Sequence, residues 1–282
     1  MSTATVIDAQ LVKTLREKTN AGLMECKKAL AETNGDVEAA VDVLRKKGTI
    51  KAGEKSDREA KEGVIAQAIL PGAKVGVLVE VNCETDFVAK NESFKAFTDD
   101  IAKKIALDPN ADVEADRIEA FQKLKENLII RRHDRVEVTG PGAVAAYIHT
   151  GGKVGVLVEV GAKKEETSTT ETFKQLVRDI TLQIAAAHPI SVDRTSVPAA
   201  TVERERAIYV EQVPPGKPAN IVENIVKGKL DKFFSTVCLV DQAFIKNPDQ
   251  TITQLVAEKS KELGDELVIR RFLRYSVGEQ IA

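Results

Sequence analysis

The chain has 282 residues, enough to bury a large core and to divide into more than one folding unit. It carries 41 basic and 43 acidic residues, a net charge of −2, and only 4% of its residues are aromatic. A protein whose main partner is nucleic acid needs excess positive charge for the phosphates and rings for the bases. This composition therefore argues against nucleic acid as the primary partner.

The sequence also limits the compartment and the cofactors. No apolar run approaches the roughly 18 residues that span a bilayer, and the N-terminus lacks the basic and apolar regions of a secretion signal. The three cysteines are Cys26, Cys83 and Cys238, which are dispersed and form no CxxC pair. Such a set fits a reducing compartment rather than a disulfide framework or a thiolate zinc site. We expect a cytoplasmic protein without membrane contact, metal or cofactor.

Residues 1–48 have the pattern of three short helices. Ile7, Leu11 and Leu15 recur at helical spacing, and the segment Asn20-Ala21-Gly22 interrupts the pattern. A second helix follows and stops at Asn34-Gly35, after which Asp36 can cap a third. A bundle this small has a thin core, so some of its apolar surface is available to a partner.

Residues 49–62 are rich in both charges and poor in apolar side chains, which predicts a linker. Beyond the linker the sequence repeats itself. The octapeptide KVGVLVEV occurs at 74–81 and at 153–160, an offset of 79. The same offset pairs GVIAQAIL with GAVAAYIH, and pairs the apolar positions of a following helix. ENLIIRRHDR matches DELVIRRFLR at an offset of 139, so the second copy contains 60 additional residues.

The repeat predicts an α+β protein with two related core subdomains, each ordered β-β-α-β. Their predicted bounds are 63–140 for the first, and 141–190 with 234–282 for the second. Within the additional residues, the segment 191–233 predicts an antiparallel helical hairpin that turns at PPGKP. A projecting hairpin cannot bury both of its apolar stripes alone, which suggests that it packs on a second chain, as in a homodimer, or on another surface.

No set of residues predicts an enzyme. The histidines are His133, His149 and His188, and none stands at a metal-binding spacing. The motifs of nucleophile elbows, phosphate loops and dinucleotide folds are all missing. Cys83 and Asp86 could meet His149 in space, but a half-buried cysteine at the end of a strand is the simpler interpretation of Cys83.

Asp86 and Phe87 stand where the strand of KVGVLVEV has ended. Phe87 or Val88 could pack as a hydrophobic staple onto the helix that begins near Ser93. The repeat tests this, because Asp86-Phe87-Val88 corresponds to Glu165-Glu166-Thr167 in the second copy. The shared architecture therefore does not require an aromatic residue here, which favours a contact role for Phe87.

Two other features allow more than one interpretation. Leu23 and Met24, at the start of the second helix, suit a small core and a docking surface equally well. His149 stands at the turn end of a strand, where a solvated histidine is the ordinary case.

LVKTLREKTNAGLMECKKALAETNGDVEAAVDVLRKKG, followed by VNCETDFVAKNESF, resembles the bacterial elongation factor Ts family, and the similarity runs from about residue 8 to residue 279. The resemblance implies a guanine nucleotide exchange factor for the GTPase elongation factor Tu, acting in translation elongation without binding nucleotide itself. It also implies that residues 1–48 resemble a ubiquitin-associated (UBA-like) domain. The GTPase-docking residues that it implies are Leu11, Val12, Arg16, Leu23, Met24, Lys27, His149 and Ile245. A wedge near the partner's magnesium site falls on Thr85, Asp86, Phe87 and Val88.

Two departures from the family pattern bear on these roles. The chain ends at Ala282 without the additional C-terminal helix of some relatives, and the TGGK turn after His149 is longer than in some of them. Two other functions stay open: an adaptor that binds proteins through residues 1–48, and an RNA-associated protein that uses the IRR segments at 130–132 and 269–271.

Overall fold

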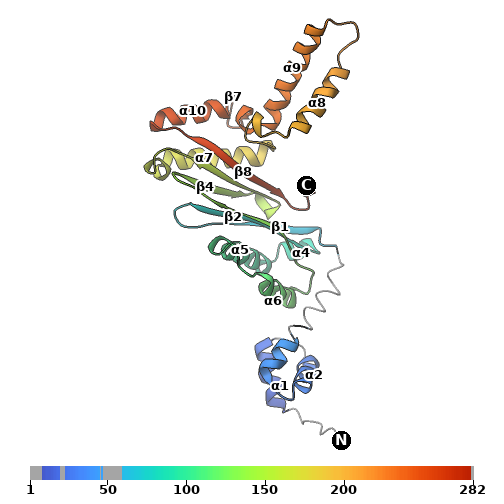
Figure 1. Ribbon diagram of the computed structural model, residues 1–282. Coiled ribbons are helices and arrows are strands. Elements are labelled where there is room, and N and C mark those ends of the chain that lie inside the picture. The colour runs from blue at the N-terminus through green and yellow to red at the C-terminus, as the bar shows by residue number, and fades with distance from the viewer. Residues whose placement is uncertain (1–7, 20–22, 45, 47–58, 281–282) are drawn as a thin grey trace.

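The computed structural model describes residues 8–19, 23–44, 46 and 59–280 (Figure 1). Ile7 and most of the predicted linker lie outside these ranges. Near the N-terminus, helices α1 (Ala9–Thr19) and α2 (Leu23–Glu32) are followed by helical residues 37–44. Asp36 caps this last segment as predicted, since its Oδ1 accepts hydrogen bonds from the backbone N–H groups of Glu38 and Ala39. The segments share one small core, made of Val12, Leu15, Cys26, Ala29, Leu30, Ala40 and Leu44.

The first half of the remaining chain is an antiparallel sheet of order β1-β2-β3 with helices between its second and third strands. Helix α5 covers one face of this sheet, where Phe94 and Ile101 are fully buried against Val77 and Val79 of β2. Its elements are β1 (Glu62–Ile69), β2 (Val75–Cys83), α4 (Asp86–Ala89), α5 (Glu92–Leu107), α6 (Glu114–Leu124) and β3 (Ile129–Glu137).

The second half repeats this plan with the order β4-β5-β8. Both sheets carry a register shift at the same place in the repeat, between Glu80 and Val81 and between Glu159 and Val160. Its elements are β4 (Gly142–Ile148), η1 (Thr150–Gly152), β5 (Val154–Gly161), η2 (Glu166–Thr169), α7 (Glu171–Ala187), α10 (Ile252–Leu263) and β8 (Val268–Ser276).

The α+β class is confirmed, but the predicted order β-β-α-β lacks a helix. Each half contains a second helix before its last strand, α6 in the first and α10 in the second. The prediction missed α6 because its apolar pattern is weak, with only Ala120 and Phe121 buried. The repeat does not indicate either helix, because the segments that match at an offset of 139 begin only after α6 and α10 have ended.

The additional residues of the second half lie between α7 and α10. Helices α8 and α9 form an antiparallel pair that projects from the core (Figure 1), and α9 runs past the predicted end at residue 233. Ile208, Val210 and Ile221 on this pair are exposed, and the homodimer stays a prediction. Among the described helices, none combines the length and the apolarity needed to cross a bilayer. The elements are η3 (Arg194–Ser196), α8 (Ala199–Glu211), α9 (Ala219–Val237), η4 (Leu239–Asp241), β6 (Ala243–Phe244) and β7 (Asn247–Thr251).

The two halves pack through the sheet faces that α5 and α7 leave uncovered. A separate core fills this interface, made of Ile65, Leu78, Val136, Val138, Val144, Leu157 and Tyr275. Leu78 and Leu157 are equivalent in the repeat, so the packing has an approximate twofold relation. Gly76 and Gly155 are also equivalent, and both let the facing sheet come close. A Cβ on Gly155 would lie 2.5 Å from Ile65 Cγ2.

Gly155→Ala should therefore destabilise the protein by about 1–3 kcal/mol, because the added methyl group overpacks the interface between the sheets. Urea unfolding of the full chain would measure the change. Gly228→Ala is the matched control, since Gly228 is exposed in α9 with nothing within 4 Å of an added Cβ. It should stabilise the chain by about 0.5–1 kcal/mol through higher helix propensity. Equal effects of the two substitutions would contradict the close sheet contact.

Two buried carboxylates join the halves in equivalent ways. Glu80 accepts from Arg131 Nη1 at 3.0 Å and from Arg132 Nε at 2.8 Å. Arg131 also donates to the carbonyl of Glu279, beyond the last strand of the other half. In the equivalent arrangement Glu159 accepts from Arg270 and Arg271, and Arg270 donates to the carbonyls of Thr139 and Pro141 in the segment after β3. Each arginine pair thus holds the segment that leaves the other half.

Candidate functional site

The single-turn helix α4 presents Phe87 to solvent. Thr85 caps the helix, its Oγ1 accepting a hydrogen bond from Val88 N at 3.3 Å. Ala89 is buried and Val88 packs on the first core, while Phe87 is 81% exposed. Of the two candidates for a staple, Val88 packs inward and Phe87 does not. A ring of this size left in water forgoes a large part of the roughly 1.5–3 kcal/mol that burial supplies, so its exposure is typical of a contact residue.

Asp86 lies beside the exposed ring and is held by one partner. Its Oδ2 accepts from Lys90 Nζ at 2.6 Å, one turn further along the chain. The hydrogen bond from Lys90 holds the pKa of Asp86 below its usual range. Asp86 is therefore ionised at neutral pH, and α4 presents an apolar ring next to a carboxylate.

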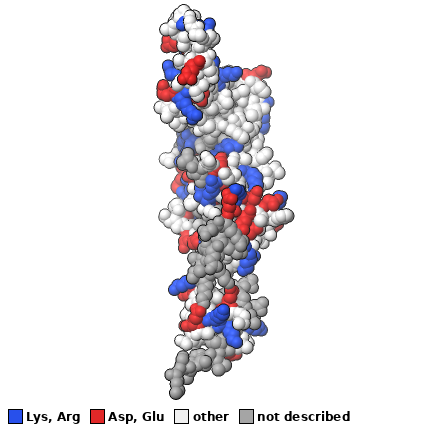
Figure 2. All heavy atoms as spheres, turned by 90° about the vertical axis from the view of Figure 1, so that its right-hand side faces the viewer, with Lys and Arg blue, Asp and Glu red and all other residues white. Residues whose placement is uncertain are grey.

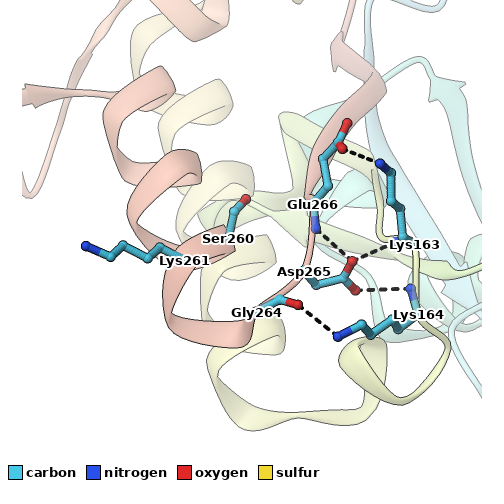
Figure 3. A pocket seen from close by; sticks show the side chains of 7 residues that line it. All are labelled: Lys163, Lys164, Ser260, Lys261, Gly264, Asp265 and Glu266. Carbon is cyan, nitrogen blue, oxygen red and sulfur yellow. Dashed lines mark hydrogen bonds and ion pairs between the residues drawn. The ribbon is translucent and has the colours of Figure 1, made fainter.

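The equivalent position in the second half has another character. The short helix η2 places Glu166 where the first half has Phe87. Beside it lies a shallow depression of about 400 Å³ (Figure 3), lined by Lys163, Lys164, Ser260, Lys261, Gly264, Asp265 and Glu266. An ion pair between Lys163 and Glu266 lies along this depression. The strand-to-helix segment after the repeated octapeptide therefore presents an aromatic ring in the first half and charged side chains in the second.

The turn that carries His149 lies at the same end of the core as α4. Lys153, at the end of this turn, donates to Glu62 Oε2 at 2.5 Å and to the carbonyl of Gly63 at 3.1 Å. Glu62 pairs in register with Cys83, the last residue of β2 before α4. His149 is exposed, and its Nδ1 lies 2.9 Å from the Tyr147 hydroxyl.

Ile245 lies in the turn between β6 and β7 and is 42% exposed. Its backbone N–H donates to Oε1 of the buried Gln183 at 2.8 Å, which fixes the turn against α7.

Figure 2 views the molecule from the side on which α4 lies in Figure 1. On this face uncharged atoms gather in the upper part of the core, and charged side chains gather lower down.

The predicted docking residues of the N-terminal helices differ in exposure. Met24 is 62% exposed and Lys27 is exposed, whereas Leu11 is half-buried. Val12 is only 6% exposed, so it supports the helix face from inside and has little surface to offer a partner. The side chains of Arg16 and Leu23 lie outside the described part of the structure.

The structure gives no support to chemistry at Cys83 or to a basic surface at the IRR segments. Cys83 is fully buried, and burial raises the pKa of its thiol to about 12. Within the described ranges, no group of three or more His, Cys, Asp or Glu side chains could hold a metal ion. All four arginines of these segments engage carboxylates; Arg131, Arg132 and Arg270 are 28% exposed or less, and Arg271 is 52% exposed. Their carboxylate partners give these arginines a structural role, and the RNA-associated function stays a prediction.

Sequence reasoning missed two residues that place this site. Lys153 ties the His149 turn to the start of β1, and Glu126 supports the start of α4 from the loop before β3. Both act across long separations in the chain. The offset of 79 could have pointed to Lys153, because it pairs this residue with Lys74.

Comparisons with known proteins identify the family. Residues 84–279 match the family model described as Elongation factor TS. Elongation factor Ts of Clostridium novyi (strain NT) is 42% identical over 291 residues, covering 97% of this chain and 94% of the relative. Its counterpart in Clostridium botulinum (strain Alaska E43 / Type E3) is 44% identical over 292 residues, with 98% and 94% covered. That of a Nitratiruptor species is 41% identical over 289 residues, again with 98% and 94% covered.

These matches, together with the duplicated α+β core, define a translation elongation factor that takes part in protein biosynthesis. The chain belongs to the elongation factor Ts family.

Proposed function

We propose that the protein is a guanine nucleotide exchange factor that binds elongation factor Tu with GDP and promotes release of the GDP. The observation that carries this proposal is the exposed ring of Phe87 beside the ionised Asp86 on α4. Family membership supports the choice of partner. The factor performs no chemistry on the nucleotide, so it is not an enzyme in the usual sense.

The proposed mechanism is a displacement. A guanine nucleotide is held by a phosphate-binding loop and by Mg²⁺, which bridges phosphate and protein oxygens. Phe87, inserted beside that site, shifts the segments that hold the metal and the phosphates, and Asp86 stabilises the shifted segment or repels the phosphates. Accelerating release by ~10⁴ requires roughly 5.5 kcal/mol of differential stabilisation.

Docking at other places offsets the strain of this displacement. We assign that role to the N-terminal unit, proposed to be UBA-like, with Leu11, Arg16, Leu23, Met24 and Lys27 on its docking face. The second half adds His149 and Ile245, both exposed in the structure. By linkage, nucleotide weakens binding of the factor by the same ratio as the factor weakens binding of nucleotide. Loading of GTP therefore releases the factor.

Release of a fluorescent GDP from elongation factor Tu, followed by stopped flow with and without the full chain, tests the function. We expect the rate to rise with the concentration of the chain and to reach a plateau. A release rate that does not change, in a mixture where binding to the GTPase is demonstrated, would favour the adaptor function instead.

A further inference from the structure

We propose that Glu126 is a positioning residue for exchange, because it fixes the helix that carries Phe87. This inference rests on the proposed function. The carboxylate of Glu126 accepts three hydrogen bonds from the chain just before α4. Its Oε2 accepts from the backbone N–H groups of Glu84 and Thr85, both at 3.1 Å, and its Oε1 accepts from Thr85 Oγ1 at 2.5 Å.

The support runs in both directions between two loops. Glu84 Oε1 accepts from the backbone N–H of Asn127 at 2.7 Å, so the segments 84–85 and 126–127 each bind the other's backbone. Thr85 then transmits the restraint, because the hydroxyl that donates to Glu126 also accepts from Val88 N. The carboxylate thus orients the residue that caps α4.

α4 needs this support because it has only four residues. One turn of helix is unstable by itself, since ordering its backbone costs more than its few hydrogen bonds return. Val88 and Ala89 anchor the inner side of the turn by packing on the core. The exposed ring of Phe87 has no comparable packing, so its direction depends on the cap and on Glu126.

The second half contains the same support without the aromatic. Asp265, the equivalent of Glu126, accepts from Lys163 N and Lys164 N at 3.1 Å (Figure 3). It also accepts from Thr167 Oγ1 at 2.6 Å. Both carboxylates are half-buried. Removing either one costs the fold similar contacts, but only Glu126 supports the helix that carries the exposed ring. The chain therefore provides its own matched control.

The test is a double-mutant cycle on the full chain, with fluorescent GDP bound to elongation factor Tu and the factor at saturating concentration. The variants are Glu126→Ala, Phe87→Ala, both together, and Asp265→Ala. We expect Glu126→Ala to slow release about tenfold and to have no further effect when Phe87 is already alanine, because coupled residues are not additive. Asp265→Ala should exchange at the wild-type rate with a similar loss of thermal stability.

The possible results separate the two proposals. If the wild-type chain leaves the rate of GDP release unchanged, the proposed function is overturned. If the wild type accelerates release and Phe87→Ala slows it, a wild-type rate for Glu126→Ala overturns only the positioning role. Equal slowing by Glu126→Ala with and without Phe87 also overturns it, as does equal slowing by Asp265→Ala. Should Glu126→Ala not fold, Glu126→Gln takes its place in the cycle, because it keeps one of the two acceptor oxygens and should slow release in the same direction only while Phe87 is present.

Discussion

Replacing Phe87 by alanine is expected to slow GDP release from elongation factor Tu about 30-fold, equivalent to roughly 2 kcal/mol, the size of a central aromatic contact. The fold should remain intact, because a ring that is 81% exposed contributes little to packing within its own chain. Its removal should change the free energy of unfolding by less than about 0.5 kcal/mol. Stopped-flow release and urea unfolding of the same preparation measure both quantities.

Two further variants show whether the slower GDP release of Phe87→Ala is specific to the wedge residues of α4. Glu166→Ala, at the equivalent position of the second half, should leave the exchange rate unchanged. Met24→Ala, in the N-terminal unit, should weaken docking, so that more factor is required while the maximal rate is kept. A Phe87→Ala protein that exchanges at the wild-type rate under saturating conditions would contradict the wedge.

Glu80→Gln should destabilise the protein by about 3 kcal/mol and lower the Tm by roughly 6–12 °C. Glu80 is fully buried, and its carboxylate accepts from Arg131, Arg132 and the backbone N–H of Gly278. Removing its charge leaves the two guanidinium groups without their shared anionic partner. Calorimetry of the two proteins gives the difference.

The charge state of Glu80 also predicts how stability depends on pH. Burial opposes ionisation, but the hydrogen bonds from Gly278 N and the two arginines outweigh it and hold the pKa of Glu80 below its usual range. The stabilisation from Glu80 is therefore complete above the unfolded pKa and is lost as the pH falls through the folded value. Glu80→Gln should remove this part of the acid dependence.

The equivalent residues supply the controls for Glu80. Glu159→Gln should lower the Tm by a similar amount, because Glu159 holds two arginines in the same way. Only Glu80→Gln should speed amide exchange at Gly278, whose N–H it binds at 2.9 Å. Glu119→Gln, on the surface beside Lys123, should change stability by less than about 0.5 kcal/mol. Equal melting of the Glu119 and Glu80 variants would contradict the buried network.

The sequence predicted the strands and the repeat well, because an apolar octapeptide kept at a fixed offset carries strong local information. It did not predict α6, in which Ala120 and Phe121 are the buried residues, since so short an apolar stripe has no clear helical period. The sequence also did not predict that the two sheets pack closely against each other. Gly76 and Gly155 stand in ordinary strand patterns, and only the facing sheet explains their small size.

The candidate site was predictable where the repeat offered an internal comparison. The mismatch between Phe87 and Glu166 predicted an exposed ring, and the ring is exposed; its contact with a partner stays a prediction. Where no such comparison existed, sequence could not separate core from surface, as with Val12 in the N-terminal core. Glu126 was not found because its contacts with Thr85 join positions 41 residues apart.

The equivalent short helices α4 and η2 differ in the residue that they present, Phe87 in the first half and Glu166 in the second, so the two halves are not interchangeable as binding surfaces. Duplication alone would produce two interchangeable ends, and a GTPase could then approach either one. At the equivalent place in the second half a partner would meet Glu166 in place of an aromatic ring, and the neighbouring Glu165 is paired with Lys74. Under the proposed function, divergence at these few positions leaves the GTPase only one productive way to bind the two related halves.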